Sequence, residues 1–591
     1  MEDSPLPLYS RKTTLQVKLT DLAANIGIKV GGMGVILAVL GLILFIFMQM
    51  FPLLQSGEVG ELSEPIKLSA DRALLIHCDE YRRVGLRINE SGSVVIFSLP
   101  TGEVIREERP ALLGAASLTS ARISLRPRSS AKIDGVQDVP MYHLLLGTSD
   151  GRLLVGTVAY VTDFLRFENA DEEPDVLEKL HMPTEEEFKA VDYMPESVVY
   201  WSPKDKAAAE AAEKAAGEAT SKSKKARQEK LRDEAVRRKQ VVEHLTSFGF
   251  YRGVHAVVEV TRAVDFKSDG LPIRAFGGSI NEAPASEDRS AVNVVVTGDG
   301  RTLLLREKSE VNPMTDEVEI STKVEDLTER VSGTPDFVLV NDRMLRVVLA
   351  NKAGLVHVFE WDPLRKRFAM PYPAFSVFAP QQDLDENRHW RDLVNEQRVS
   401  AGFEASTDTL ALTAVNYLIG DQTVIFADSR GGLQAWFAVP GADESSPRRL
   451  TRARTHRPSR NAIVQVAASP VNKGFLAVEG SGHIRAINNT GSREFVDFTL
   501  DGAVNACMAR KGDGILVVGT DGAVHQWWVD APHSEASFST LFGKVWYEDF
   551  KEPSYEWQTT SGTDDTEPKI NLIPLVSGTL KGAIYALLFF F

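Results

Sequence analysis

The fold of this chain is decided by a short stretch near its C-terminal end, Ile515-Leu-Val-Val-Gly-Thr-Asp521-Gly522-Ala-Val-His-Gln-Trp527. An apolar run leads into an Asp-Gly turn, and apolar residues alternate with polar ones after it. Asp-Gly supplies the positive φ angles that a tight hairpin turn requires, and the alternation directs one face of the second strand inward. The stretch therefore predicts a β-hairpin.

Six similar stretches precede this hairpin. The seven turns end at Gly92, Gly151, Gly300, Gly354, Gly432, Gly482 and Gly522. They recur at roughly 40 to 77 residues, apart from one long gap between the second and the third. Units too small to bury a face alone stack radially as propeller blades. We therefore expect an all-β, seven-bladed propeller over residues 60–540. The pattern resembles WD40-like repeats, with Trp361, Trp436 and Trp527 only loosely at the signature position. A two-sheet sandwich and two separate β domains are the alternatives.

The long gap predicts an insertion over residues 165–250. Residues 165–196 are acidic, and an Ala/Lys/Glu/Arg-rich stretch runs from residue 205 to about residue 245. Good helix formers without a consistent apolar stripe predict a solvated helix or helical hairpin. A partner-docking arm is the functional alternative. A second helical patch is expected over residues 384–397.

An uncharged stretch separates Lys29 from Glu58 and exceeds the roughly 20 residues that cross a bilayer as a helix. Basic residues precede it and glutamates follow it. The positive-inside rule then makes residues 1–28 a cytoplasmic N-terminus, residues 29–54 a transmembrane helix, and the remainder extracytoplasmic. The rival interpretation is a cleaved signal peptide, but the apolar run is too long and no small-residue cleavage site follows it.

The charge and the motifs exclude several function classes. A net charge of -15 and a pI near 5.4 argue against nucleic-acid binding. The sequence contains no Walker A, HExxH, GxSxG or EF-hand pattern. We therefore expect no enzymatic activity, no cofactor and no bound metal, and the chain itself should not hydrolyse nucleotides. His77 and His357 are interpreted as ordinary strand residues rather than ligands.

The two cysteines, Cys78 and Cys507, fall at near-equivalent places in the first and last predicted blades. Those blades are neighbours in a closed ring, so a disulfide that staples the ring is one reading in an oxidising compartment. Two buried free thiols are the favoured reading, because equivalent strands of adjacent blades usually lie too far apart for a disulfide.

One segment is strongly basic in an otherwise acidic chain. Its arginines are Arg448, Arg449, Arg452, Arg454, Arg457 and Arg460. Guanidinium groups bind phosphate and carboxylate in a bidentate manner, which predicts a site for anion or partner docking. The alternative is a solvated loop between the fifth and sixth blades.

Both ends of the chain resemble a known family. The matching parts are Lys544-Val545-Trp546-Tyr547-Glu548, Glu552-Pro553-Ser554-Tyr555, Ser561-Gly562-Thr563-Asp564-Asp565, Glu567-Pro568-Lys569, Pro574-Leu575-Val576-Ser577-Gly578-Thr579-Leu580-Lys581, Gly31-Gly32-Met33-Gly34-Val35-Ile36 and Phe51-Pro52-Leu53-Leu54. They resemble the permease subunit of phosphate-specific ABC transporters, in the long form with a large periplasmic domain between the first two membrane helices.

The resemblance implies the N-terminal portion of a permease for phosphate uptake across the bacterial inner membrane. Residues 541–571 would be a linker to the permease core, and residues 572–591 the start of a second transmembrane helix, truncated there. The implied partners are a second permease subunit, a cytoplasmic ATPase subunit and a periplasmic phosphate-binding protein. The propeller would serve docking or regulation. The alternative function is a membrane-anchored periplasmic scaffold for protein–protein interaction. A quinoprotein-like enzyme is a third and weaker hypothesis, because no cofactor constellation is visible.

Overall fold

The computed structural model describes residues 14–50, 55, 57–62, 64–133, 136–166, 250–280, 290–311, 318–381, 388–441, 443, 446–531, 533–558 and 566–590. They belong to two compact units, Met1–Gln55 and Ser56–Phe591. The predicted helical insertion over residues 165–250 lies outside the described residues, apart from its two ends.

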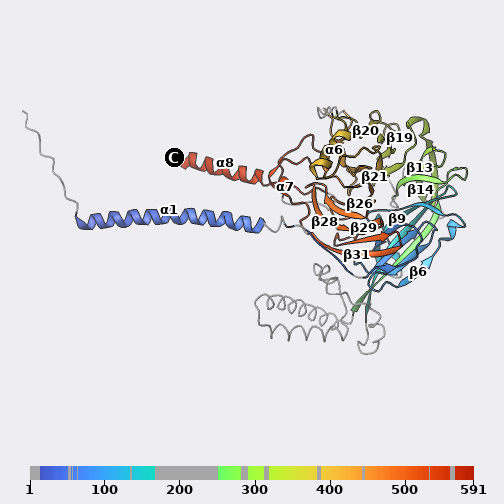
Figure 1. Cartoon of the computed structure of the whole chain (residues 1–591), viewed down its shortest axis with the longest axis horizontal. Coiled ribbons are helices and arrows are strands. Elements are labelled where there is room, and N and C mark those ends of the chain that lie inside the picture. The colour runs from blue at the N-terminus through green and yellow to red at the C-terminus, as the bar shows by residue number, and fades with distance from the viewer. Residues whose placement is uncertain are drawn as a thin grey trace, which may run out of the picture. The chain divides into compact units, whose positions relative to one another are not determined.

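Seven antiparallel sheets make up the body of the second unit (Figure 1). The first sheet contains β3 (Ala73–Cys78), β4 (Val84–Asn89), β5 (Val94–Ser98) and β6 (Val104–Glu108). The second contains β7 (Leu118–Ile123), β8 (Ser129–Ile133), β9 (Val136–Thr148), β10 (Leu153–Arg166) and β11 (Phe250–Ala263). The third contains β12 (Ile273–Ile280), β13 (Ala291–Thr297), β14 (Thr302–Val311) and β15 (Val318–Asp326).

The fourth sheet contains β16 (Phe337–Val340), β17 (Arg346–Ala350), β18 (Leu355–Asp362), β19 (Arg367–Ala369) and β20 (Phe375–Ser376). The fifth contains β21 (Leu412–Tyr417), β22 (Thr423–Asp428), β23 (Leu433–Val439) and β24 (Arg449–His456). The sixth contains β25 (Ile463–Ala468), β26 (Gly474–Glu479), β27 (His483–Asn488) and β28 (Arg493–Thr499). The seventh contains β29 (Ala503–Met508), β30 (Gly514–Gly519) and β31 (Ala523–Asp530). In the first six sheets the chain enters at an inner strand and moves outward.

The sheets form a closed ring. The inner strands β3, β7, β12, β16, β21, β25 and β29 each contact the next in that order, and β29 contacts β3. The predicted seven-bladed β-propeller is therefore confirmed, with seven four-stranded blades and short extra strands on three of them.

The beginning of the chain completes the last blade. Strand β1 (Glu58–Glu61) pairs antiparallel with β31, from Glu58 opposite Asp530 to Glu61 opposite Trp527, and β2 (Ile66–Lys67) pairs with the same strand. The seventh blade thus takes its outer strand from a segment that precedes the first blade. This pairing covers the edge of β31, which would otherwise be left unpaired.

The glycines that predicted the seven hairpins have the backbone conformation that the turns require. Gly92, Gly151, Gly300, Gly354, Gly482 and Gly522 all have φ between 80° and 91°. In the fifth blade the left-handed residue is Gly431, with φ of 80°, rather than the following glycine. At Gly522 a Cβ atom would lie 2.2 Å from the carbonyl oxygen of Ser69, so a larger residue would push the first blade away from the last.

The apolar core is divided among the junctions between blades. An apolar cluster fills each of the seven junctions, including the one between the seventh blade and the first. Strands β4, β13, β22, β26 and β30 are buried at every residue, because each sheet is covered on both faces. A sandwich or two separate domains would not need the seventh junction, so those alternatives are wrong.

Four α-helices accompany the propeller in the described ranges. These are α1 (Leu15–Met50), α6 (Trp390–Ser400), α7 (Phe538–Phe542) and α8 (Ile573–Phe590), with 3₁₀ turns at Ala111–Leu113 and Thr328–Arg330. Helix α6 confirms the second helical patch, displaced from the predicted 384–397, of which 384–387 lie outside the described residues.

The two predicted membrane segments are helical. Residues 29–54 fall in α1 up to Met50, with 51–54 outside the described residues, and residues 572–591 fall largely in α8. Among the parts of these helices that can be described, none is long and apolar enough to cross a membrane. The predicted membrane crossing thus has no support from the described residues.

Candidate functional site

Two of the six arginines predicted as a docking site contact the C-terminal segment of the chain. Arg454 on β24 forms an ion pair with Glu567 at 3.2 Å and donates a hydrogen bond to the carbonyl oxygen of Trp546. Arg448 pairs with Asp549 at the surface. The structure therefore offers these two guanidinium groups an anionic partner within the same chain.

The other four arginines point to separate neighbours. Arg449 and Arg452 lie over the rings of Tyr372 and Trp390, at 5.5 and 5.1 Å from the ring centroids. Arg457 is exposed and pairs with Glu494 at 3.4 Å. The exposed Arg460 accepts a hydrogen bond at its carbonyl oxygen from Arg398. The structure thus spreads the six predicted residues over several contacts instead of converging them on one point.

Buried charged residues form the centre of the contact between the C-terminal segment and the propeller. Lys473, in the turn between β25 and β26 of the sixth blade, donates hydrogen bonds to Oε2 of Glu548 and to the carbonyl oxygen of Ile419, both at 2.7 Å. Thr423 donates to the other oxygen of Glu548 at 2.5 Å. The backbone N–H of Glu548 donates in turn to Glu567 at 2.6 Å. Residues 548 and 567 are thereby fixed against the fifth and sixth blades.

Burial makes the charge balance of this contact sensitive to pH. Burial and the nearby Glu567 carboxylate raise the pKa of Glu548 to about 7, although Lys473 and the hydrogen bond from Thr423 act in the opposite direction. The side chains of Lys473 and Glu548 are only 1% and 9% exposed. The pair is therefore nearly shielded from water, and its strength depends on whether Glu548 carries its charge.

The docked segment leads directly into α8. Asn571 is fully buried, and its amide group donates to the carbonyl oxygens of Thr540 on α7 and Gly543, at 3.1 and 2.5 Å. Its Oδ1 accepts the backbone N–H of Ile573, the first residue of α8, at 3.0 Å. One side chain thus caps α8 and joins it to the propeller unit.

Residues 541–571 are not the linker that the resemblance implies, because most of that range is folded onto the propeller. Residues 559–565 lie outside the description, so the matched stretch 561–565 is not placed. The docking residues Glu548 and Glu567 were missed as a site, although both belong to matched motifs. The available signal was the acidic character of residues 544–567 together with a strongly basic strand elsewhere in the chain.

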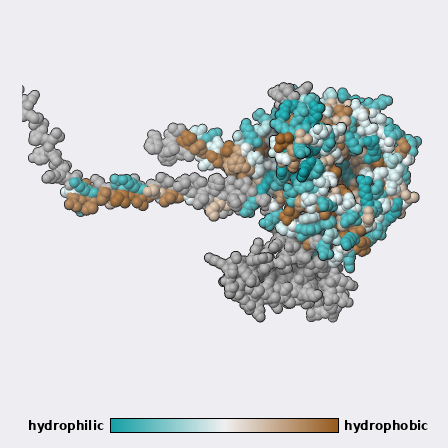
Figure 2. All heavy atoms as spheres, in the orientation of Figure 1, coloured by the Kyte–Doolittle hydropathy of each residue, from teal (hydrophilic) through white to brown (hydrophobic). Residues whose placement is uncertain are grey.

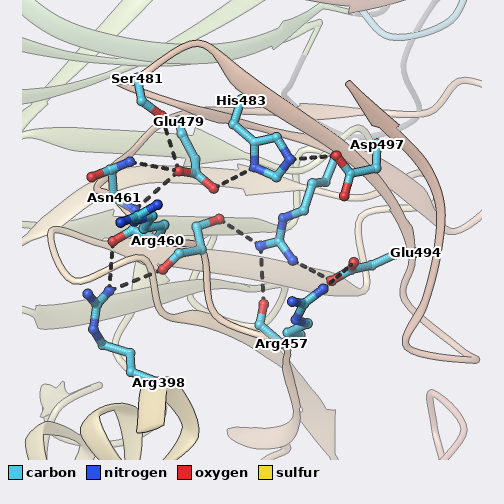
Figure 3. Close-up of polar contacts among 11 residues, drawn as sticks. Arg398, Arg457, Arg460, Asn461, Glu479, Ser481, His483, Glu494 and Asp497 are labelled. Carbon is cyan, nitrogen blue, oxygen red and sulfur yellow. Dashed lines mark hydrogen bonds and ion pairs between the residues drawn. The ribbon is translucent and has the colours of Figure 1, made fainter. Parts of the chain in front are cut away.

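A second polar network joins the fifth and sixth blades (Figure 3). Arg398 on α6 donates to the carbonyl oxygens of Arg430, Ser459 and Arg460. His483 lies between Glu479 and Asp497, with ring nitrogens 2.9 and 2.5 Å from their oxygens. Burial alone would lower the pKa of His483, but these carboxylates outweigh it and raise that pKa. The network orders the blade junction beside the predicted basic segment.

The seven inner strands surround a cavity of about 290 Å³ at the ring centre. Its charged lining consists of Arg122, Arg128, Arg510, Asp342 and Asp421. Arg122 donates to the carbonyl oxygen of Val338 at 2.9 Å, and Arg128 pairs with Asp342. Burial raises the pKa of Asp421 to about 6 against the effect of the nearby Arg128. The cavity is polar and links several blades across the ring.

The residues first interpreted as strand residues lie in strands. His77 on β3 is hydrogen-bonded through Nδ1 to the Tyr160 hydroxyl at 2.9 Å, and burial together with Arg510 lowers its pKa to about 4. His357 on β18 accepts the backbone N–H of Ser332 at 3.0 Å. Both histidines thus have structural partners in the chain.

Comparisons with known proteins add little to this geometry. No protein-family model matches the chain, and no curated protein matches it in sequence. Among solved structures, the chain is similar to the β-propeller domain of Cps50 (Swd1) from Myceliophteria thermophila, at 8% identity, over 79% of this chain and 99% of that domain, with a TM-score of 0.39. Because that score is low, the fold assignment rests on the sheets and on the ring contacts. They define the chain as a seven-bladed β-propeller protein.

Proposed function

We propose that the chain is a docking scaffold, in which a closed propeller presents surfaces for other proteins and is tethered through apolar helices at its two ends. The observation that carries this proposal is the buried contact of residues 543–558 and 566–571 with the fifth and sixth blades. Through Glu548, Glu567 and Asn571, this contact connects the propeller to the first residue of α8.

The side chains of both helices favour an apolar surrounding. On α8, Leu575, Val576, Leu580 and Ile584 are 43–60% exposed within the described unit. Figure 2 shows hydrophobic residues along α8 and along part of α1, while the visible propeller surface is mainly hydrophilic or neutral. Exposed apolar side chains on a helix are stabilised by lipid or by a helix of another subunit. We infer that the helices lie in the bacterial inner membrane and that the propeller is periplasmic.

The finer proposal is that the scaffold belongs to a phosphate-uptake permease. It rests on the resemblance of residues 544–548, 552–555, 567–569 and 574–581 to that family. In this reading the propeller docks or regulates the periplasmic phosphate-binding protein. A second permease subunit and a cytoplasmic ATPase subunit would supply the rest of the pathway and the energy. The second candidate is a membrane-anchored scaffold without a transport partner, which the self-contained ring favours equally well.

Co-purification separates these two candidates. The tagged full chain is expressed with the second permease subunit and the ATPase subunit, extracted in detergent and purified. The permease proposal predicts that all three co-purify and that the phosphate-binding protein binds the complex. If the chain is recovered from membranes without either subunit, the scaffold candidate is supported instead.

A matched pair of variants tests the tether itself. Leu580→Glu, on α8, is expected to reduce recovery of the chain in the membrane fraction, because a carboxylate is costly in hydrocarbon. Leu364→Glu is the control, because Leu364 is 95% exposed in the turn between β18 and β19. Equal membrane recovery of both variants would show that α8 does not contribute to the tether, and a chain found entirely in the soluble fraction would contradict the tether as a whole.

A further inference from the structure

The two cysteines of the chain lie at the junction between the first and the seventh blade, which we call the seam of the ring. Cys78 is the last residue of β3, the inner strand of the first blade, and Cys507 lies on β29, the inner strand of the seventh. These two strands contact each other, and both cysteines belong to the apolar cluster between those blades. A hydrogen bond to Cys507 is the largest cause of the raised pKa of the Cys78 thiol, ahead of its burial. The sulfur atoms are therefore neighbours.

Chance does not readily explain this placement. A buried residue contacts about 6–12 others, so two residues placed at random in a chain of this length would touch in roughly 1–2% of cases. The sequence contains only these two cysteines, 429 positions apart (507 − 78). Equivalent strands of adjacent blades are usually too far apart for a disulfide. The inner strands converge towards the ring centre, and that convergence brings this pair together.

The seam is also the place where the ring most needs a covalent link. Every other junction joins blades that are consecutive in the chain, whereas this one joins the first blade to the last. Its other ties are non-covalent and include the pairing of β1 with β31, the hydrogen bond from buried Arg87 to the carbonyl oxygen of Gly522 at 2.7 Å and the ion pair of Arg82 with Asp513 at 3.6 Å. Strand β1 follows α1 after a short connection in the sequence. A force applied to α1 would therefore act first on the pairing of β1 with β31.

We propose that Cys78 and Cys507 form a modification site, a dithiol that oxidises to a disulfide and locks the first blade to the seventh. Both thiols are free in the structure, which corresponds to the reduced form. The disulfide would hold the inner edge of the seam, while β1 holds the outer edge of the seventh blade. The ring would then stay closed even when β1 is pulled from β31.

The oxidation requires an external disulfide as the oxidant. Cys507 lines the central cavity and is less buried than Cys78, so its thiolate is the attacking group. It attacks one sulfur of the oxidant, and one thiol leaves with the proton that Cys507 gave up. The Cys78 thiolate then attacks Cys507 in the mixed disulfide and releases the second thiol. Two thiols of the chain are oxidised, and one disulfide of the oxidant is reduced to two thiols.

Oxidised glutathione is the probe for the purified full chain in detergent. After treatment, the remaining thiols are alkylated in denaturant and the protein is digested for mass spectrometry. The proposal predicts a peptide pair linked through Cys78 and Cys507. It also predicts a melting midpoint several degrees above that of the chain kept reduced, because closing so long a loop restricts the unfolded chain. Two alkylated cysteines, or links only between two copies of the chain, would overturn it.

Two single variants separate the bond from packing effects. Cys507→Ser and Cys78→Ala should each abolish the rise in midpoint on oxidation, whatever their own midpoints are. Cys507 is the more tolerant position because it is only partly buried. A rise on oxidation that persists in either variant would show that the bridge does not clamp the seam.

The state of the pair in cells rests on the periplasmic location proposed above. Acid quenching of living cells followed by alkylation is expected to find both cysteines oxidised there. Reduced cysteines in cells, combined with ready bridge formation in the purified chain, would contradict the location while supporting the geometry of the pair.

Discussion

Replacing Lys473 by Met tests the buried contact between the propeller and the C-terminal segment. Met keeps the length of the side chain but removes the ammonium group, which is hydrogen-bonded to Glu548 and to the carbonyl oxygen of Ile419. Loss of a charge-assisted hydrogen bond costs about 1.5–3 kcal/mol. We expect Lys473→Met to lower the free energy of unfolding by that amount at pH 6. At this pH Glu548 can bind a proton and stay buried without the Lys473 ammonium group.

The cost should rise with pH by an amount that follows from the pKa of Glu548. In the wild type the folded value is about 7 against 4.5 for the free group, so the folded state binds more protons and its stability falls as pH rises. Between pH 6 and pH 8 this fall is about 1.4 kcal/mol. Without Lys473 the pKa of Glu548 rises further, and the fall becomes steeper, with an upper limit of about 2.7 kcal/mol for one proton over two pH units.

The assay is guanidinium denaturation at pH 6 and pH 8, followed by tryptophan fluorescence, because Trp546 lies in the docked segment and packs on Phe437. Lys473 also lowers the pKa of Asp421, which lines the central cavity. The double variant Lys473→Met/Glu548→Gln therefore serves as the control that isolates the glutamate. An equal loss of stability at both pH values for Lys473→Met would refute this reasoning. It would also be refuted if the double variant still showed a steeper pH dependence than the wild-type chain.

Three further predictions concern the same framework. Asn571→Ala should speed hydrogen exchange in the first turn of α8 and cost about 1–2 kcal/mol, because it removes a helix cap; unchanged exchange would argue against the cap. Arg454→Met should make residues 543–558 sensitive to protease, since it breaks a buried ion pair, whereas Arg448→Ala should change protection by at most about 1 kcal/mol, because that pair is exposed. Gly60→Val should lower stability by about 1–3 kcal/mol, because its Cβ would lie 2.5 Å from the indole nitrogen of Trp528; a stable variant with β1 still paired would contradict the closing role of β1.

The blades were predictable because each contains a hairpin with a local signal. Gly and Asp-Gly turns impose positive φ, and that requirement is visible in a dozen residues of sequence. The expectation of one inward face was too simple, because strands such as β22 and β30 are buried on both faces. Their nearly continuous apolar runs, as in Thr423–Asp428, were the available sign of two-sided burial.

The long-range contacts were not predictable in the same way. Strand β1 has only four residues and completes a blade that begins more than 400 positions later. Likewise, Glu548 and Glu567 have no repeat or spacing that points to Lys473 and Arg454. The basic segment was recognised as unusual, but the partners of Arg448 and Arg454 emerged only from the fold. Such pairings depend on how the closed ring brings distant segments together.

The location of the propeller is the central claim that one measurement can test most directly. Leu364→Cys places a thiol at a 95% exposed position, while the native Cys78 and Cys507 are expected to be joined in the disulfide proposed above. Cells with a permeabilised outer membrane are treated with a membrane-impermeant maleimide, and the wild-type chain is the control. The account predicts that the variant is labelled while the inner membrane is intact and that the wild type is not. Labelling only after the inner membrane is lysed would contradict a tethered periplasmic propeller.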